Sequence, residues 1–267
     1  MPRLGVIGWP VDHSRSPAMF TAAFAELGLS EWRYQRLPVP PELFEQTTRS
    51  LSTAGFAGAN VTIPHKHAAL ELADQASQAA LQIGAANTLT FLPDGAIHAT
   101  NTDAPGLIAA LAQLTNMSAH PSAMVLGAGG SARAAVWALR QAGASEISLH
   151  NRTYERALKL AREFDISAVR TPVPADLLIN CTSVGLELSA TESQALNQLA
   201  LTFDAVGKYS YVVDFVYSTS ETALLTAARR CGAATLDGLE LLLAQGALSF
   251  EHWIGQKAPI EAMRRGA

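Results

Sequence analysis

The sequence predicts an α/β protein made of two successive series of strands and helices. Short apolar runs typical of buried strands alternate with stretches whose apolar residues recur at helical spacing. A polar connector, Thr115 to Ser122, separates the two series. Because helices that lie between strands in sequence cover the faces of a mostly parallel sheet, we expect such a sheet in each series.

Length and composition indicate a globular protein with a large core. The chain has 267 residues, of which 49% are hydrophobic and 16% charged. The net charge of −4 and the lack of a Lys/Arg cluster argue against nucleic acid, so we expect a small-molecule partner. No apolar run is long enough for a membrane span or a secretory signal. Cys181 and Cys231 lack metal-ligand spacing, which favours reduced thiols in a cytoplasmic protein.

The first series starts with a strand at 4–8 and a helix after it. Ser16-Pro17 would supply the N-cap and a proline in the first turn of this helix. The further elements expected are strands at 32–36 and 59–63 and helices at 41–52, 68–73 and 76–83. Strands at 87–91 and 96–99 should form a hairpin, because Pro93-Asp94-Gly95 is turn chemistry. A helix at about 105–114 then leads to the connector.

The second series opens with a glycine-rich turn between a strand at 124–126 and a helix at 133–142. The turn is Gly127-Ala128-Gly129-Gly130-Ser131-Ala132. Its first glycine permits a tight bend, its second lets the backbone approach a pyrophosphate, and Ala132 allows close packing of the helix. A plain tight turn is the alternative. The strand before it and the helix after it favour a Rossmann-type dinucleotide site.

The strand expected at 146–150 ends in a segment that distinguishes NADP from NAD. An NAD enzyme would place an acidic residue here to bind the ribose 2′-hydroxyl, but the segment is Asn151-Arg152-Thr153. Arg152 and Arg156 instead offer guanidinium groups suited to a 2′-phosphate. A solvated helix start is the alternative for both arginines. The pattern favours NADP.

Eight motifs, in order, resemble those of the shikimate dehydrogenase family. They are HSRSP (13–17), NVTIPHK (60–66), GAANTL (84–89), NTD (101–103), GAGGSARA (127–134), NRT (151–153), INCTSVG (179–185) and GLELLLAQ (238–245). The resemblance implies a substrate-binding domain (1–102 with 238–267), a Rossmann domain for NADP (103–237), and a cleft between them. It also implies an oxidoreductase that interconverts 3-dehydroshikimate and shikimate with NADPH, in chorismate and aromatic amino-acid biosynthesis.

The glycine-rich turn and the resemblance together define the expected cofactor site. Its residues are Gly127, Ala128, Gly129, Gly130, Ser131, Ala132, Asn151, Arg152, Thr153, Arg156, Thr182, Phe215 and Gly238.

Lys66 stands between two histidines, and three interpretations compete. A metal would need more ligands than His65 and His67, and no third one lies nearby in sequence, so no metal is expected. A solvated lysine is the general alternative. However, Lys66 follows the end of a strand, where α/β sheets place ligand sites, and it matches the catalytic lysine that the resemblance implies.

The resemblance implies that Asp103 lies beside Lys66 and orients it. Lys66 would move the hydroxyl proton if it is neutral, or stabilise the developing alkoxide if it is charged, and both remain open. Asp103 has an ordinary alternative as the N-cap of the helix near Pro105.

The resemblance implies six substrate-binding residues. Ser14 and Ser16 resemble the hydroxyl pair that receives the substrate carboxylate, although Ser16 could equally be only an N-cap. Thr62, Asn87, Tyr217 and Gln245 match positions that bind the carboxylate or ring hydroxyls. Each of these four has an ordinary structural alternative.

Two departures from the family pattern bear on the substrate. Phe20-Thr21 stands where the family usually has His-Asn, and Tyr217-Ser218-Thr219 replaces Tyr-x-Pro. The alternatives are therefore a quinate-type paralogue acting on a related cyclohexene or cyclohexane carboxylic acid, and a non-catalytic ligand sensor. Retention of Lys66, Asp103 and the nucleotide motif argues against a sensor. A monomer and a homodimer both remain open.

Overall fold

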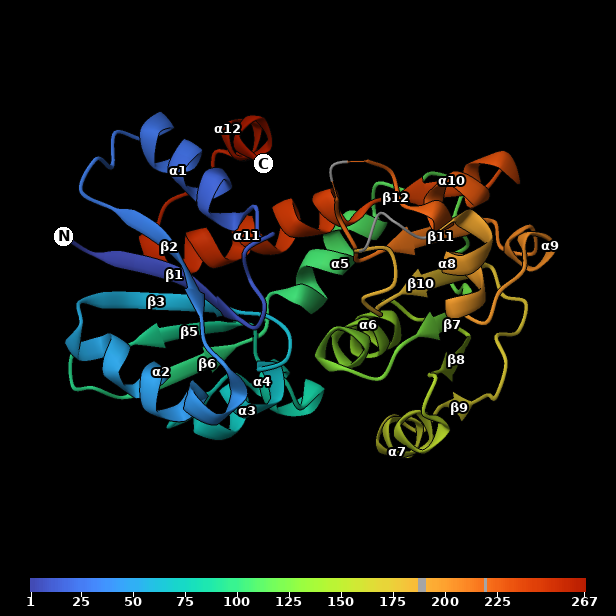
Figure 1. Ribbon diagram of the computed structural model, residues 1–267, viewed down its shortest axis with the longest axis horizontal. Helices are drawn as coiled ribbons and strands as arrows, with labels where there is room; N and C mark the ends of the chain where they lie inside the picture. Colours follow the sequence, from blue (N-terminus) through green and yellow to red (C-terminus); the bar gives the residue numbers. More distant parts are fainter. Residues whose placement is uncertain (187–190, 219) are drawn as a thin grey trace. The chain divides into compact units, whose positions relative to one another are not determined.

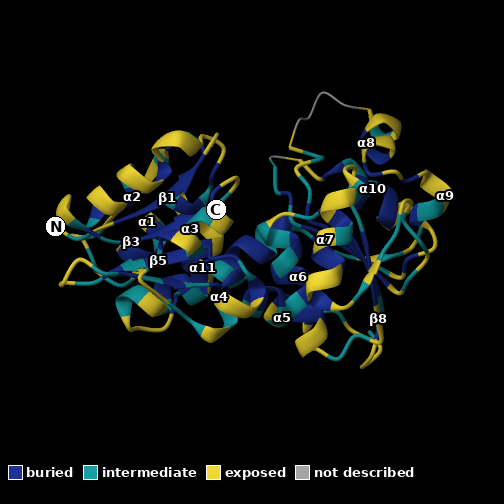
Figure 2. Ribbon diagram, turned by 90° about the horizontal axis from the view of Figure 1, so that it is seen from below, coloured by how far each residue is buried: buried dark blue, intermediate teal, exposed yellow. Residues whose placement is uncertain are grey.

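The computed structural model describes residues 1–186, 191–218 and 220–267, which form two compact units (Figure 1). Unit 1 comprises Met1–Gly106 with Leu242–Ala267, and unit 2 comprises Leu107–Leu241. Each unit has its own six-stranded sheet with helices packed on it, so the predicted α/β fold class is confirmed. In both units the central strands are largely buried, whereas the edge strands and the outward faces of the helices are more exposed (Figure 2).

Unit 1 has a mixed sheet with the strand order β2-β1-β3-β5-β6-β4. Its elements are β1 (Arg3–Gly8), α1 (Ser16–Glu26), β2 (Arg33–Pro38), a 3-10 helix (Pro41–Leu43), α2 (Phe44–Thr53), β3 (Phe56–Val61), α3 (Lys66–Leu72), β4 (Gln75–Ala76), α4 (Gln78–Ile83), β5 (Thr88–Phe91), β6 (Ile97–Thr100) and α12 (Ile260–Gly266). β1 runs parallel to β2 and β3. The predicted hairpin is confirmed: β5 is antiparallel to both β3 and β6.

Phe20, one of the departures from the family pattern, belongs to the core of unit 1. Its side chain is fully buried, and its ring stacks on Tyr34 with centroids 4.3 Å apart. Phe24, Phe250 and Trp253 surround it. Phe20 is therefore the centre of an aromatic cluster, which stabilises unit 1 by burying apolar area.

Unit 2 has a fully parallel sheet with the strand order β12-β11-β10-β7-β8-β9. Its elements are β7 (Ser122–Leu126), α6 (Gly130–Gln141), β8 (Glu146–His150), α7 (Tyr154–Phe164), β9 (Ser167–Ala168), β10 (Leu177–Asn180), α8 (Glu192–Gln198), α9 (Phe203–Val206), β11 (Tyr211–Asp214), α10 (Ala223–Arg230) and β12 (Ala234–Leu236). Counted from β7, this order reads 3-2-1-4-5-6 from the β9 edge, which is that of the doubly wound Rossmann fold. The order reverses between β7 and β10, and ligands bind at the carboxyl ends of the strands at such a point.

Two helices run from one unit into the other. The helices are α5 (Asp103–Leu111) and α11 (Gly238–Ile254). The N-cap predicted at Ser16 is wrong, and so is the alternative role of Asp103 as an N-cap. Ser16 is the first residue of α1 and not its N-cap, which is Arg15 without a side-chain cap bond. Asp103 is likewise inside α5, where the side chain of Asn101 caps the N–H of Ala104 at 3.2 Å. At α5, Asn101, Thr102 and Asp103 are all cap-forming residue types, whereas at α1 the cap position falls on Arg15, which is not. The backbone path, and not the residue type, therefore decides where each helix begins.

In the described part of the chain, no helix combines the length and the apolar character needed to cross a bilayer.

Candidate active site

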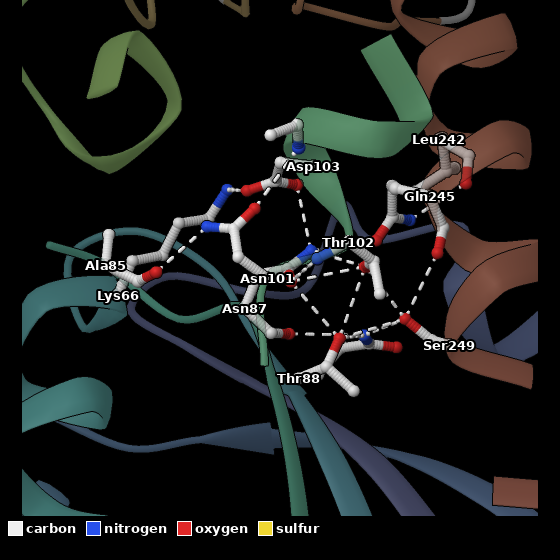
Figure 3. A network of polar contacts seen from close by, with 12 residues as sticks. Lys66, Ala85, Asn87, Thr88, Asn101, Thr102, Asp103, Leu242, Gln245 and Ser249 are labelled. Carbon is white, nitrogen blue, oxygen red and sulfur yellow. Dashed lines mark hydrogen bonds and ion pairs between the residues drawn. The ribbon is translucent and has the colours of Figure 1, made fainter. Parts of the chain in front are cut away.

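Lys66 and Asp103 form a buried ion pair in unit 1 (Figure 3). Lys66 begins α3 and Asp103 begins α5, and the Lys66 Nζ donates to the Asp103 Oδ2 at 2.7 Å. The two side chains are 12% and 8% exposed, so solvent and salt screen the pair much less than a surface pair. The fold therefore brings into contact the two residues that the resemblance assigns to catalysis.

Asn87 holds the other oxygen of the Asp103 carboxylate. Its Nδ2 donates to the Asp103 Oδ1 at 2.9 Å, and its Oδ1 accepts the backbone N–H of Thr102 at 2.7 Å. Asn87 is buried just before β5, and it bonds two consecutive residues at the start of α5. Since each carboxylate oxygen has its own donor, the plane of the Asp103 carboxylate is fixed before a substrate arrives.

Gln245 is part of the same network. Its Oε1 accepts from the Asn87 Nδ2 at 3.2 Å, and its Nε2 donates to the Leu242 carbonyl at 2.8 Å. The helix that carries it comes very close to α5, because a Cβ at Gly106 would lie 2.9 Å from the Gln245 backbone nitrogen. Glycine at 106 therefore allows Gln245 to reach Asn87.

A layer of hydroxyl and amide groups beneath the ion pair was missed by the sequence analysis. Ser249 Oγ lies 3.0 Å from both Thr88 Oγ1 and Thr102 Oγ1, and it accepts from the Asn60 Nδ2 at 2.9 Å (Figure 3). Ser249 itself is fully buried. The available signal was a serine one helical turn after Gln245 in an apolar stretch, where a buried hydroxyl needs partners.

Ser14 and Ser16 lie in the loop after β1 and at the start of α1. Because β1 and β3 are adjacent and parallel, this loop and Thr62 lie at the same edge of the sheet. Both serines are 4% exposed, and the Ser16 hydroxyl has no hydrogen-bond partner among the described residues. The Nε and Nη2 of Arg36 donate to the Ser14 carbonyl at 3.1 and 2.6 Å, which fixes the loop.

We expect Ser14→Ala and Ser16→Ala to raise the KM for the carboxylate substrate far more than they lower kcat. Contacts that are equally strong in the ground state and the transition state change binding alone. Steady-state kinetics at saturating cofactor measure both constants. Thr21→Ala is the control, since Thr21 is an exposed hydroxyl residue on the same helix. A fall in kcat with an unchanged KM would show that the serines do not anchor a carboxylate.

The two histidines beside Lys66 have different surroundings. His65 is buried, stacks on Phe44 at 4.5 Å, and places its Nε2 2.7 Å from the Val39 carbonyl, and burial lowers the pKa of its imidazole. His67 is exposed, with its Nε2 3.4 Å from Glu71. Within the described ranges, no three His, Cys, Asp or Glu side chains are grouped as metal ligands would be. His65 is therefore packed and hydrogen-bonded as a core residue, whereas His67 is a solvated one.

The glycine-rich turn of unit 2 has the geometry that a dinucleotide phosphate requires. Gly127 has φ 110°, and a Cβ there would lie 3.1 Å from the carbonyl of Cys181. Gly129 caps α6, and a Cβ there would meet no atom within 4 Å. The N–H groups at the start of α6 thus lie beside open space, where a pyrophosphate fits.

The two arginines after β8 are available to a ligand. Arg152 and Arg156 are exposed, and neither side chain makes a hydrogen bond or ion pair with any described residue. Asn151 shapes the turn, since its Nδ2 donates to the Thr153 carbonyl at 2.9 Å. Two guanidinium groups without a protein partner fit a 2′-phosphate.

The remaining predicted cofactor residues are Thr182 after β10, Phe215 after β11 and Gly238 at the start of α11. The Thr182 hydroxyl donates to the Asn180 Oδ1 at 2.7 Å, and the Phe215 N–H donates to the Asn180 carbonyl at 2.9 Å. Gly238 packs against this turn, because a Cβ there would lie 2.7 Å from the Phe215 carbonyl. Tyr217, predicted to bind substrate, is half-buried and belongs to unit 2. The departure at Thr219 lies outside the described residues.

Fold and site together define a class of protein. A Rossmann sheet with a glycine turn after its first strand and arginines after its second is typical of a pyridine-nucleotide enzyme. A buried lysine-carboxylate pair has the chemistry of an acid/base group for an alcohol or carbonyl substrate, which such an enzyme needs.

Comparisons with known proteins identify the family. Its models match residues 6–89 (shikimate dehydrogenase substrate binding domain), 109–200 (shikimate / quinate 5-dehydrogenase) and 238–265 (shikimate 5'-dehydrogenase C-terminal domain). The chain is 42% identical over 268 residues to a shikimate dehydrogenase (NADP(+)) of Methylobacterium radiotolerans, covering 96% of this chain and 92% of that protein. It is 40% identical over 276 residues to one of Methanopyrus kandleri, covering 98% and 93%.

A solved structure agrees with the sequence comparisons. The crystal structure of shikimate 5-dehydrogenase from Thermus thermophilus in complex with NADP(H) and shikimate matches with a TM-score of 0.87 and 38% identity, covering 100% of this chain and 98% of that chain. The chain belongs to the shikimate dehydrogenase family, as its eight motifs predicted.

Proposed function

We propose that this protein is an NADP-dependent shikimate dehydrogenase, which reversibly reduces 3-dehydroshikimate to shikimate in chorismate and aromatic amino-acid biosynthesis. The observation that carries the proposal is the buried Lys66–Asp103 pair on a chain whose second unit is a Rossmann fold. The relatives' NADP(+) specificity supports the cofactor. A cytoplasmic location is part of the proposal, and the presence of Cys181 and Cys231 as thiols is consistent with it.

We assign the two ligands to the two units. Substrate binds to 1–102 with 238–267, and NADP binds to 103–237. Supporting this assignment, each boundary lies within four residues of the division into units at Gly106 and Leu242. The residues of unit 1 proposed to bind the substrate are Ser14, Ser16, Thr62, Asn87 and Gln245. The substrate-binding role of Tyr217, which belongs to unit 2, stays a prediction from the resemblance.

The residues of unit 1 supply the acid/base part of the reaction, and NADPH supplies the hydride when bound. Lys66 donates a proton or hydrogen bond to the substrate carbonyl oxygen as that oxygen gains charge, and it accepts the proton in the reverse direction. Asp103 holds the Lys66 Nζ at 2.7 Å, and Asn87 prevents the carboxylate from rotating away. Ser14 and Ser16 bind the carboxylate of the ring. The substrate is thus oriented before the proton moves.

Steady-state assays with shikimate and with quinate, each with NADP and with NAD, test the proposed function. We expect the highest kcat/KM for shikimate with NADP. A preference for quinate would make the protein a quinate-type paralogue instead. No turnover with any pair, from a folded protein that binds both ligands, would support a sensor and contradict the proposal.

A further inference from the structure

A fully buried aspartate lies at the carboxyl end of β11, outside the site around Lys66. Asp214 is 0% exposed, and its Oδ1 accepts from the Asn180 Nδ2 at 2.9 Å and from the Val216 N–H at 3.0 Å. Its Oδ2 accepts from the Thr222 hydroxyl at 2.7 Å. All three donors are neutral. Burial, with a smaller contribution from the negative charge of Asp237, raises the pKa of Asp214 to about 6.

The three donors belong to three different segments. Asn180 ends β10, and its Oδ1 accepts from the backbone N–H and the hydroxyl of Thr182 at 3.0 and 2.7 Å. Val216 lies in the turn after β11. Thr222 is the N-cap of α10 and accepts from the Leu225 N–H at 3.4 Å. One carboxylate therefore ties together both turns and the start of a helix.

These turns lie on one particular side of the nucleotide site. In the strand order, β8 with Arg152 is on one side of the Gly127 turn after β7, and β10 and β11 are on the other. If the arginine holds the adenosine 2′-phosphate and the glycine turn holds the pyrophosphate, the nicotinamide half extends toward β10 and β11. Thr182 and Phe215 follow these strands.

Burial of the charged Asp214 carboxylate destabilises the folded protein, which indicates that this residue has a role other than stability. A charge buried without a cation costs free energy that a neutral group of the same shape would not. Such departures from the most stable choice are expected where a site must be held in one geometry.

We propose that Asp214 is a positioning residue for the nicotinamide half of NADP(H). Its carboxylate holds the Thr182 turn and the Phe215–Val216 turn at the spacing that the cofactor requires. The inference rests on the proposed function, because it requires that unit 2 binds NADP(H).

Binding measurements with two ligands test this role directly. The ligands are NADPH and 2′,5′-ADP, a fragment that lacks the nicotinamide. Asp214→Leu leaves three buried donors without an acceptor, so we expect NADPH to bind at least about tenfold more weakly. Binding of 2′,5′-ADP should change by less than about twofold, because the turn at Gly127 and Arg152 is untouched.

The conservative variant should restore binding. In Asp214→Asn, the amide oxygen accepts from Asn180 and Val216, and the amide N–H donates to the Thr222 hydroxyl, which can also accept. We expect NADPH affinity within about twofold of the wild type. If Asp214→Leu does not fold, Thr222→Val should weaken NADPH about three- to tenfold, with Thr222→Ser as its matched control.

Three results would overturn the proposal: unchanged NADPH binding in Asp214→Leu (or in Thr222→Val, if that is the variant tested), equal weakening of both ligands, or no rescue by asparagine. Failure of the proposed function looks different, because the wild type itself would then not bind NADPH.

The stability of Asp214→Asn should depend on pH in a defined direction. The folded pKa of Asp214, about 6, is above its ordinary value of 3.8, so the folded state binds the proton more tightly. The free energy of unfolding of the wild type therefore falls as the pH rises from about 4 to 6. Above that window the buried carboxylate is ionised and its destabilising effect is complete. We expect a higher urea midpoint for Asp214→Asn than for the wild type at about pH 8, and equal midpoints at about pH 4. A difference that does not change with pH would contradict a buried charge.

Discussion

Replacing Lys66 by alanine is expected to lower kcat by about 10²- to 10⁴-fold, which is the contribution of a positioned acid/base group. KM should change less if the lysine acts mainly in the transition state. The protein should still fold, because Asn87 continues to hold the Asp103 carboxylate and the lysine fills no apolar core. NADPH binding should persist, since the residues proposed to bind it lie in unit 2. Steady-state kinetics and NADPH titration measure these effects.

The flanking histidines serve as unequal controls. His67 is exposed, so His67→Ala should leave kcat nearly unchanged. His65 is buried against Phe44 and bonded to Val39, so His65→Ala should lower stability by about 1–3 kcal/mol and must be compared at a temperature where it is folded. Near-normal kcat in Lys66→Ala, or loss of wild-type turnover on adding a chelator, would contradict the mechanism.

Replacing Arg152 by alanine is expected to weaken NADP(H) far more than NAD(H). One charge-assisted contact to a phosphate contributes about 1.5–3 kcal/mol, or about 10- to 150-fold in affinity. NAD lacks the 2′-phosphate, so its binding affinity should change little. Cofactor titrations of the wild type and the variant measure the loss of affinity for NADP(H) and for NAD(H).

Arg162→Ala is the matched control for charge and helix. Arg162 is an exposed arginine on α7, in the last turn instead of at the start. Arg162→Ala should leave the affinities for NADP(H) and NAD(H) unchanged. An equal loss for NADP and NAD in Arg152→Ala would remove the assignment of Arg152 to the 2′-phosphate.

Local patterns predicted most of the secondary structure. The strand at 146–150 is found as predicted, because apolar and polar residues alternate along it between a turn and a helix start. The hairpin at Pro93-Asp94-Gly95 and the glycine turn at 127 are also found, since their backbone conformations favour these residues. The cap of α1 lies one residue before the predicted Ser16, and Asp103 does not cap α5, because residue type alone does not fix where the backbone enters a helix.

The network around the ion pair was outside the reach of local patterns. Ser249 contacts Asn60, Thr88 and Thr102 across separations of up to 189 residues. Such contacts depend on how α11 packs on the sheet, which periodicity does not determine. Asp214 was missed for the same reason, since an acid at the end of an apolar strand looks like a turn residue until its burial is known.

The central claim is that Lys66 and Asp103 act as one catalytic unit, and a double-mutant cycle tests it most directly. The measurement is kcat/KM for shikimate with NADP in the wild type, Lys66→Ala, Asp103→Asn and the double variant. Residues that act as a unit are strongly non-additive, so the double variant should be about as slow as Lys66→Ala alone. If the two losses multiply in the double variant, each residue works independently, and the account of the pair is wrong.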